Sequence, residues 1–269
     1  MRAALASTLA LLLAGSSALA QPAAPTAAPQ VTTVGANLNV TPKRVTFSRA
    51  QRSASVFIFN QGTAPATFDI AMVDRVMTPD GQIMALEEAL KNPDAKPLAE
   101  KVKSAKDLVI VSPRRVTLGP GKGQTIRLRA TEAPGDGSAE YRSHLTITTI
   151  PPRDAGLTAE QAASGEPGEL RIVINSVFGL SIPAIVRQGD IDVRAAIENA
   201  RIEFADMSPD GVKPPEKTAV MVFEVLRQGH NSLFGNFEVR PVGSRAGNPL
   251  GIARGVGVYT ELDRRTVRI

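Results

Sequence analysis

Few side chains in this sequence could do acid–base, nucleophilic or metal chemistry. The chain has two histidines, His144 and His230, and no cysteine. We expect His144 on the surface of a strand, because it lies in an alternating segment, and His230 in the turn "RQGHNS". Neither histidine has a carboxylate or a second histidine at the spacing of a metal site. The sequence therefore predicts no metal site.

Nucleophile and phosphate motifs are also missing. The sequence has no Gly-x-Ser-x-Gly elbow, the turn that exposes a serine nucleophile. The segment "LGPGKGQT", residues 118–125, superficially resembles a phosphate loop, but Lys122 is followed by Gly123 and Gln124 and then by a strand pattern instead of a helix. We expect a hairpin turn here, and we predict a protein with no catalytic residues, no enzymatic activity and no cofactor.

Binding is the remaining possibility, and it centres on one alternating segment, "GELRIVINSVFGLSIPAIVRQG", residues 168–189. Its even-numbered positions are almost all apolar, and this period of two predicts a strand with one apolar face. The apolar even positions are Leu170, Ile172, Ile174, Phe178, Leu180 and Ile182. Typical strands have roughly 5–6 residues, so this strand is longer than its own sheet needs.

The beginning of the chain indicates the compartment. Residues 1–20 have the charged residue Arg2, an apolar run through Leu13 and the small-residue exit "ALA", which predict a secretory signal peptide cleaved before Gln21. We expect residues 21–36, rich in Gln, Pro, Ala and Thr, to be a disordered lead-in. No later segment is long and apolar enough to span a bilayer, so the protein is not expected to be membrane-embedded.

Composition narrows the class of partner. Lys and Arg number 31 against 26 Asp and Glu, and 4% of the residues are aromatic. A basic stripe with interleaved aromatic residues, which is typical of nucleic-acid binding, is missing. We therefore expect no nucleic-acid partner. Because an exported chain without cysteine has no disulfides, its stability must come from its core.

Short alternating segments separated by Gly- and Pro-rich turns predict antiparallel β-sandwiches from residue 37 onward. The strands expected before the long one are "NLNVTPKRVTF", "SASVFIFNQ", "ATFDIAMVDRVM", "LVIVSP", "RRVTL", "QTIRLRA" and "YRSHLTITTI". Those expected after it are "DIDVRAAI", "ARIEFADM", "TAVMVFEVLR", "FGNFEVRPV", "GIARGVGVYT" and "RRTVRI". We expect two domains, residues 37–187 and 188–269, with the long strand last in the first.

Residues 85–107, "ALEEALKNPDAKPLAEKVKSAKD", break the strand pattern. They are charged and rich in alanine, and Pro93 and Pro97 interrupt them. The segment fits a surface insertion with one or two helical turns, or a solvated loop. The solvated loop is the structure that we expect.

Several motifs in a fixed order carry a family resemblance. "VTPKRVTFSRAQRSASVFIFNQG" has Arg44 three residues before Phe47, then a polar turn and an apolar strand that ends in asparagine. "VSPRRVTLGPGKGQTIRLRA" has a proline, an apolar strand, a Gly-rich turn and Gln-x-x-Arg, and "EYRSHLTITTIPP" ends a strand in Ile-Pro-Pro. Followed by the long strand and "IPAIVR", the set resembles the periplasmic pilus (fimbrial) chaperones of the chaperone–usher pathway, over residues 37–269.

The resemblance implies two Ig-like antiparallel β-sandwich domains in a boomerang arrangement, in the periplasm. Pilus subunits are incomplete Ig-like domains that expose an apolar groove and an open sheet edge. Such a chaperone fills the groove with its long strand until an outer-membrane usher exchanges it for the next subunit's extension. The implied partners are therefore pilus subunits and the usher. The residues that resemble the family's strand-pairing row are Leu170, Ile172, Ile174 and Phe178.

The family also anchors the C-terminal carboxylate of the subunit with two basic residues, one on the first strand and one on the long strand. Arg44 matches the first of these. Counting back from Pro183, the second falls near Phe178, where the sequence has no basic residue. Either another base, such as Arg187 or Lys43, replaces it, or Arg44 acts alone.

Two alternatives stay open. The competing function is an exported Ig-like structural or adhesion module, whose long strand would only complete its own core. The second concerns residues 188–269, which are few for an Ig-like sandwich of about seven strands. We expect this second sandwich to be incomplete, or the chain to be shortened, with one sheet edge uncovered.

The variant Ile172→Asp tests the strand-pairing interpretation. We expect it to keep the first domain folded, because an edge-facing position contributes more to binding than to the core. We expect it to lose capture of a pilus subunit, because the new carboxylate would enter an apolar groove. Co-purification with a candidate subunit and a thermal melt measure the two effects. Loss of folding together with binding would return Ile172 to the core and favour the structural module.

Overall fold

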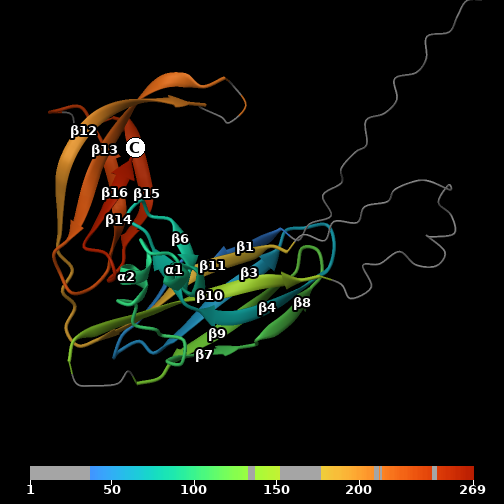
Figure 1. Ribbon diagram of the computed structural model, residues 1–269. Coiled ribbons are helices and arrows are strands. Elements are labelled where there is room, and N and C mark those ends of the chain that lie inside the picture. The colour runs from blue at the N-terminus through green and yellow to red at the C-terminus, as the bar shows by residue number, and fades with distance from the viewer. Residues whose placement is uncertain (1–36, 133–136, 152–176, 209–211, 213, 244–246) are drawn as a thin grey trace, which may run out of the picture. The chain divides into compact units, whose positions relative to one another are not determined.

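A computed structural model describes residues 37–132, 137–151, 177–208, 212, 214–243 and 247–269 (Figure 1). The regular structure of these residues is almost entirely β-strand, which confirms the all-β fold class. The expected signal peptide and lead-in, residues 1–36, lie outside the described residues. So does the first half of the long strand, with Leu170, Ile172 and Ile174.

Two sheets enclose one buried apolar cluster and form a first sandwich. The four-stranded sheet has the order β1-β3-β9-β7, with the bounds Leu38–Thr41, Ser53–Asn60, Gly123–Ala130 and Val109–Ser112. The five-stranded sheet has the order β2-β11-β10-β4-β8, with the bounds Val45–Phe47, Gly179–Gln188, Ala139–Ile150, Ala66–Val73 and Arg115–Leu118. All neighbours are antiparallel except β2 and β11, which are parallel.

The predicted alternation holds in these strands. Val56 and Ile58 of β3, and Phe68 and Ile70 of β4, are almost completely buried in the cluster between the two sheets. Successive side chains of a strand point to opposite faces, so every second residue reaches this core. Burial of a side chain of this size stabilises the fold by about 1.5–3 kcal/mol.

Three strand and turn predictions in this part of the chain are wrong. "ATFDIAMVDRVM" is not one strand, because β4 lies in the five-stranded sheet, whereas β5 (Arg75–Met77) pairs with β6 (Ile83–Ala85) in a sheet of its own. "NLNVTPKRVTF" is not one strand, because β1 lies in the four-stranded sheet and β2 in the five-stranded sheet. The turn of residues 118–125 is not a hairpin, since β8 pairs with β4 and β9 pairs with β3 and β7. It passes instead from one sheet to the other around Asn60, whose side chain donates to the Leu118 carbonyl at 3.1 Å and whose own carbonyl accepts from Gly121 at 2.9 Å.

Five strands form a second sandwich around another apolar cluster. The three-stranded sheet has the order β12-β13-β16, with the bounds Ala195–Met207, Glu216–Arg227 and Arg264–Arg268. The two-stranded sheet pairs β14 with β15, with the bounds Leu233–Val239 and Gly251–Val258. The cluster also includes Met77 and Ile185, which precede these strands in the sequence.

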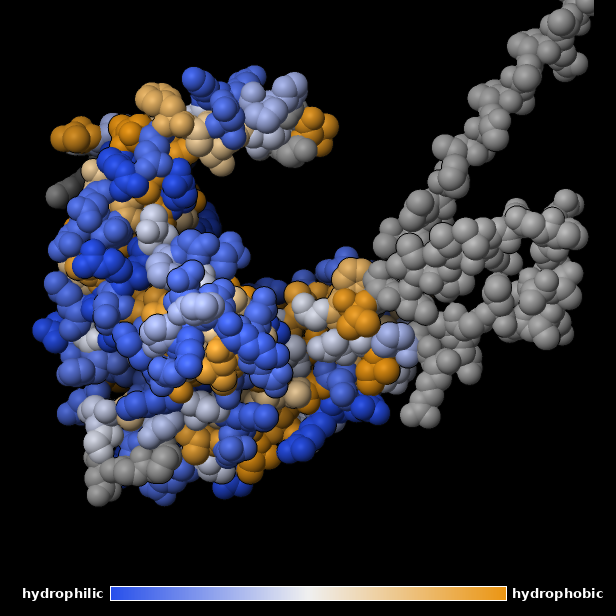
Figure 2. Space-filling model, in the orientation of Figure 1, coloured by the Kyte–Doolittle hydropathy of each residue, from blue (hydrophilic) through white to orange (hydrophobic). Residues whose placement is uncertain are grey.

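Within its described residues the second sandwich has five strands, whereas an Ig-like domain has about seven. One strand, β12, combines the last three residues of the expected strand "DIDVRAAI" with all of "ARIEFADM". Its pairing with β13 shifts between Glu198 and Arg201. Within the described part of the chain β12 pairs on one side only. Its apolar residues Ile202 and Phe204 are 62% and 74% exposed, and Figure 2 shows apolar surface at the outer end of the β12–β13 ribbon.

The prediction of a solvated loop at residues 85–107 is wrong. The segment follows the hairpin of β5 (Arg75–Met77) and β6 (Ile83–Ala85) and contains helices α1 (Leu86–Lys91) and α2 (Lys96–Ala99). Its small residues are buried in a cluster of their own, which also includes Val76. The buried alanines are Ala89, Ala95 and Ala99. Alanine brings little surface to a core, so the charged residues around it dominate the sequence pattern and disguise the packed face.

The variant Ala89→Asp tests this packing. Ala89 has no exposed surface, so the carboxylate would be buried without a designed partner, and we expect unfolding in denaturant to require at least ~2 kcal/mol less free energy. The matched control is Leu90→Asp, at the next residue of α1, which is 44% exposed. Equal stability of the two variants would mean that the segment is solvated.

Candidate functional site

Arg44 directly precedes β2 and lies partly buried against the second sandwich. Its Nη2 donates to Ser232 Oγ at 3.1 Å, and its guanidinium carbon lies 4.6 Å from the centre of the Phe234 ring. Nη1 is buried and has no hydrogen-bond partner among the described residues. Burial lowers the pKa of Arg44, because removing the charged form from water is unfavourable. Repulsion from the positive charges of Arg187 and Arg142 lowers this pKa further.

Arg187, near the end of β11, reaches the same serine. Its Nη2 donates to the Ser232 carbonyl at 3.0 Å and to Ser232 Oγ at 3.4 Å. Its Nε donates to Glu140 Oε2 at 2.9 Å. Lys43 points elsewhere, with its Nζ on Asn39 Oδ1 at 3.5 Å in an exposed contact. Of the two bases that the sequence offered as a second cation, the structure therefore brings only Arg187 to Arg44.

Strand β10 supplies the polar floor of this site. Its even-numbered residues Glu140, Arg142 and His144 are almost completely buried. The odd-numbered residues between them point to the opposite face of the sheet, toward the first core. Glu140 Oε2 also accepts from the Ser232 backbone N–H at 3.1 Å. The turn before β14 is thereby attached to the first sandwich by a carboxylate.

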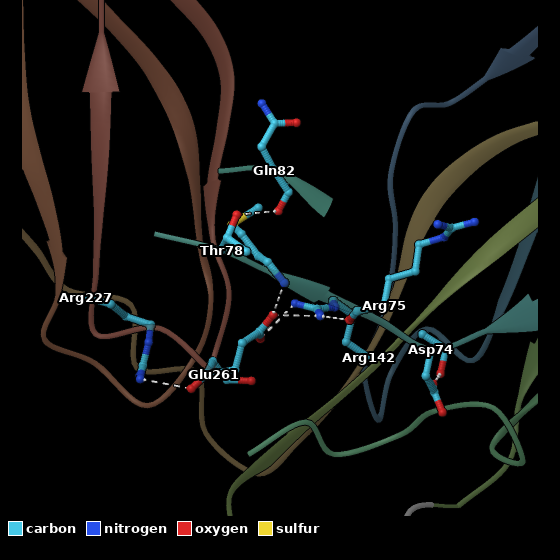
Figure 3. A network of polar contacts seen from close by, with 10 residues as sticks. Asp74, Arg75, Thr78, Gln82, Arg142, Arg227 and Glu261 are labelled. Carbon is cyan, nitrogen blue, oxygen red and sulfur yellow. Dashed lines mark hydrogen bonds and ion pairs between the residues drawn. The ribbon is translucent and has the colours of Figure 1, made fainter. Parts of the chain in front are cut away.

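A buried ion pair joins Arg142 to Glu261 (Figure 3). The guanidinium donates to both carboxylate oxygens, at 2.9 and 2.8 Å, and the two side chains are 3% and 1% exposed. Glu261 also accepts from the Met77 backbone N–H at 2.9 Å, and Arg142 donates to the Arg75 carbonyl at 2.5 Å. The pair therefore connects β10 both to the β5–β6 hairpin and to the second sandwich.

The charges of this cluster do not balance. Glu261 neutralises Arg142, and Glu140 neutralises Arg187. Arg44 has no carboxylate partner within the described residues, although Glu140 attracts it from a longer distance. The cluster thus retains an excess positive charge in a partly desolvated position, where a carboxylate from outside would bind more strongly than on an open surface.

The prediction that His144 lies at the surface is wrong. His144 is 2% exposed and its ring meets Tyr259 edge-on, with 6.1 Å between the ring centres. Burial, together with repulsion from Arg142, Arg75 and Arg44, lowers its pKa to about 3. It is therefore neutral at ordinary pH and adds no charge to the site. His230 is exposed in a turn, as predicted.

The outer edge of β11 is only partly occupied. One edge pairs with β10 from Gly179 to Gln188, whereas the other pairs with β2 only from Ala184 to Val186. Among the described residues, nothing pairs with the outer edge between Gly179 and Pro183. Since Val45 is level with Ala184 in this parallel register, Arg44 is level with Pro183, just before β2 begins and beside the bare part of the edge.

Apolar side chains accompany this edge. Along β11 the row that faces the first core is buried at Ile182, but Leu180 is 37% exposed. Phe178, just before β11, is 46% exposed, and its carbonyl accepts from the Thr149 N–H at 2.8 Å. The expected apolar row therefore continues beyond the core as exposed surface, and Figure 2 shows apolar surface at this end of the first sandwich.

Sequence reasoning missed most of the partners of the two arginines. Glu140 stands in an alternating polar pattern that looks the same whether water or protein covers it. Ser232 and Phe234 stand in and after a turn, and Glu261 is one acidic residue among many. None of these positions has a local signal that could have identified it.

No family model matches the sequence, and no curated protein matches it. The chain is similar to solved structures of chaperones, among them DraB of E. coli, with 11% identity and a TM-score of 0.42 over 87% of this chain and 85% of that one. Another is the CsuC–CsuE chaperone–tip adhesion subunit complex of Acinetobacter baumannii, with 14% identity and a TM-score of 0.42 over 87% of each chain. Salmonella enterica SafB, solved with the pilin SafA, has 12% identity and a TM-score of 0.40 over 86% of this chain and 83% of that one.

These structures are of the kind that the sequence resembles. Within the described residues, no group of three or more His, Cys, Asp or Glu side chains could hold a metal ion. None of the helices described has the length and apolar character needed to cross a membrane.

The variant Glu261→Ala tests the buried ion pair. It would leave Arg142 charged, buried and unpaired, so we expect a loss of about 3–5 kcal/mol in the free energy of unfolding. The double variant Arg142→Met, Glu261→Leu should recover most of this loss, because no isolated charge remains. Denaturant unfolding gives both values.

The control for this experiment is Asp69→Ala, which breaks the exposed pair of Asp69 with Arg115, whose side chains are 51% and 63% exposed. We expect it to cost far less than Glu261→Ala, because water already solvates both side chains. A loss for Glu261→Ala as small as that of the control would contradict the importance of the buried pair.

Proposed function

We propose that the protein is a periplasmic chaperone that binds pilus or fimbrial subunits by β-strand pairing and delivers them to an outer-membrane usher. It would perform no catalysis. Its two binding elements would be the bare edge of β11, continued into the preceding apolar residues, and the arginine pair at Ser232. A subunit with an open sheet edge and a free C-terminal carboxylate would engage both.

The bare edge of β11 supports strand pairing. An unpaired strand edge presents free N–H and C=O groups, to which an extended partner segment can add as one more strand. Hydrogen bonds of the main chain would then give affinity, and the exposed Phe178 and Leu180 would give the partner an apolar contact. We propose the same role for Leu170, Ile172 and Ile174, which continue the row in the sequence.

The two arginines support recognition of a carboxylate. Arg44 lacks a carboxylate partner in the described part of the chain, and its Nη1 is buried without an acceptor there. A buried donor without an acceptor costs about 1–3 kcal/mol, which an incoming carboxylate would relieve. Arg187 shares Ser232 Oγ with Arg44 and is proposed as the second cation.

One observation carries this proposal: Arg44 is level with Pro183, at the boundary between the segment of β11 that β2 covers and the segment that is bare. A partner strand that added to the bare edge in line with β2 would meet Arg44, which stands just before the first residue of β2. If that partner strand ended there, its terminal carboxylate would lie beside the unpaired guanidinium. Strand pairing and carboxylate binding would thus be satisfied by one ligand in one register.

The variant Arg44→Ala tests the anchor. We expect it to weaken subunit capture by about 2–5 kcal/mol, the range for truncating one member of a buried charge pair. We expect little change in melting temperature. Arg44→Lys should recover part of the affinity, since an ammonium group cannot reproduce the fork of the guanidinium. Titration against a subunit encoded beside this protein measures the affinities.

The matched control is Arg127→Ala, which removes an exposed arginine of β9 and should leave capture unchanged. Full binding by Arg44→Ala would overturn the anchor and leave capture to the apolar strand. Absence of any subunit complex with the unmodified protein would instead favour the structural or adhesion module.

A further inference from the structure

Strand β12 is a long sheet edge with apolar side chains. It has 13 residues, and in the described part of the chain it pairs only with β13. Its residues Ile197, Ile202 and Phe204 are 56%, 62% and 74% exposed. Figure 1 shows β12 along the outer side of the second sandwich. An exposed edge of this kind can pair with another chain.

The exposed apolar residues lie on the core side of their sheet. In the β12–β13 register, Ile197 is opposite Val225 and Ile202 is opposite Met221. Val225 belongs to the second apolar cluster, and Met221 packs against it. Residues directly opposite each other share a face of the sheet, so β12 extends this apolar face beyond the core.

The main-chain groups of Ile202 point toward the bare edge. Met221 exchanges both of its backbone hydrogen bonds with Ile269, at 2.8 and 2.9 Å, so its N–H and C=O groups point away from β12. Ile202 and Met221 are therefore a pair without hydrogen bonds between them, in which each residue directs its main-chain groups away from the other. Phe204, two residues further along, has the same orientation.

Charges beside Ile202 make this edge complementary to itself. Arg201 and Glu203 flank Ile202 and form an ion pair of 2.6 Å on the opposite face of the sheet. If two copies joined their β12 edges antiparallel, with Ile202 opposite Ile202, each Arg201 would face a Glu203 of the other copy. On the apolar face, Phe204 would lie opposite Ala200, whose small side chain leaves room for the ring.

Neighbouring registers lack this match. A shift of two residues in one direction would place Glu203 opposite Glu203, and a shift of two residues in the other direction would place Arg201 opposite Arg201. Like charges directly opposite each other are destabilising. A shift of one residue would oppose Ile202 to a residue whose main-chain groups point toward β13. The edge therefore favours the register centred on Ile202.

We propose that the β12 edge is a dimer interface, to which a second copy of this chain adds its own β12 about a twofold axis at Ile202. The two three-stranded sheets would continue into each other, and Ile202 and Phe204 would pack against the second copy. The bulge between Glu198 and Arg201 would end the pairing on each side, which keeps the assembly closed at two copies. The interface uses neither β11 nor Arg44, so it is independent of the proposed function.

Sedimentation velocity of the full chain over a series of concentrations measures the association. We expect the unmodified protein to form a dimer as its concentration rises. The variant Ile202→Pro removes an N–H group that points out of the sheet, so we expect it to lose the dimer. Its melting temperature should change little, because proline is tolerated where the N–H of an edge strand faces solvent.

The variants Arg201→Glu and Glu203→Arg test the register. Each places like charges opposite each other twice, so we expect each alone to associate at least about tenfold more weakly. Mixed in equal amounts, the two variants should form a heterodimer, because every contact between positions 201 and 203 then joins opposite charges. The matched control is Arg240→Glu, which reverses a charge in another ion pair between residues two apart, with Glu238 at 2.8 Å. It should associate like the unmodified protein.

A monomer at every concentration would overturn the proposal and leave the apolar edge to a different partner. A dimer that Ile202→Pro and Arg201→Glu leave unchanged would overturn it as well, since another surface would then join the copies. A mixture that associates as weakly as either variant alone would overturn the pairing about Ile202. Subunit capture by Arg44 is unaffected by each of these results.

Discussion

The structure depends on the burial of strand β10 on both faces. Odd-numbered residues such as Leu145 and Ile147 belong to the first apolar core. Even-numbered residues turn polar groups toward the second sandwich, and among them Glu140 and Arg142 carry charges. Burial of an unpaired ion costs several kcal/mol. This face can therefore be covered only where partners such as Glu261 stand opposite, which restricts the segments of the second sandwich that can lie against it.

Strand β11 is constrained from both sides as a result. Ala184 and Val186 pack in the first core, whereas Ile185 packs in the second. Ten residues of β11 pair with β10, so the strand cannot shift register without moving every one of its side chains to the other face. The bare segment from Gly179 to Pro183 is therefore held in an extended conformation before any partner arrives. Such preorganisation lowers the entropic cost of adding another strand.

The three arginines of the polar cluster, Arg142, Arg44 and Arg187, differ in how they are paired. Arg142 and Glu261 satisfy each other and contribute mainly by excluding arrangements in which either would be buried alone. Arg44 is partly buried without such a partner in the described residues, so it remains available to an external anion. Glu140 stands between these cases, because it neutralises Arg187 but leaves Arg44 with its charge. Strand β10 thus supplies one member of each buried ion pair, whereas the unpaired guanidinium comes from Arg44, before β2.

The sequence by itself determined most of the strands and turns, because a period of two and turn composition are local properties. Arg44 was named only through the family resemblance, and its binding role stays a prediction. The sequence also named Arg187, but only as one of two possible substitutes for the second cation. Only the tertiary structure decided that β1 and β2 lie in different sheets, that His144 is buried and that Glu140, Arg187 and Ser232 meet. The physical reason is that a polar face on a strand has the same sequence pattern whether it faces water or another protein surface. Which of the two covers it depends on residues far away in the chain, such as Ser232, which is 92 positions from Glu140.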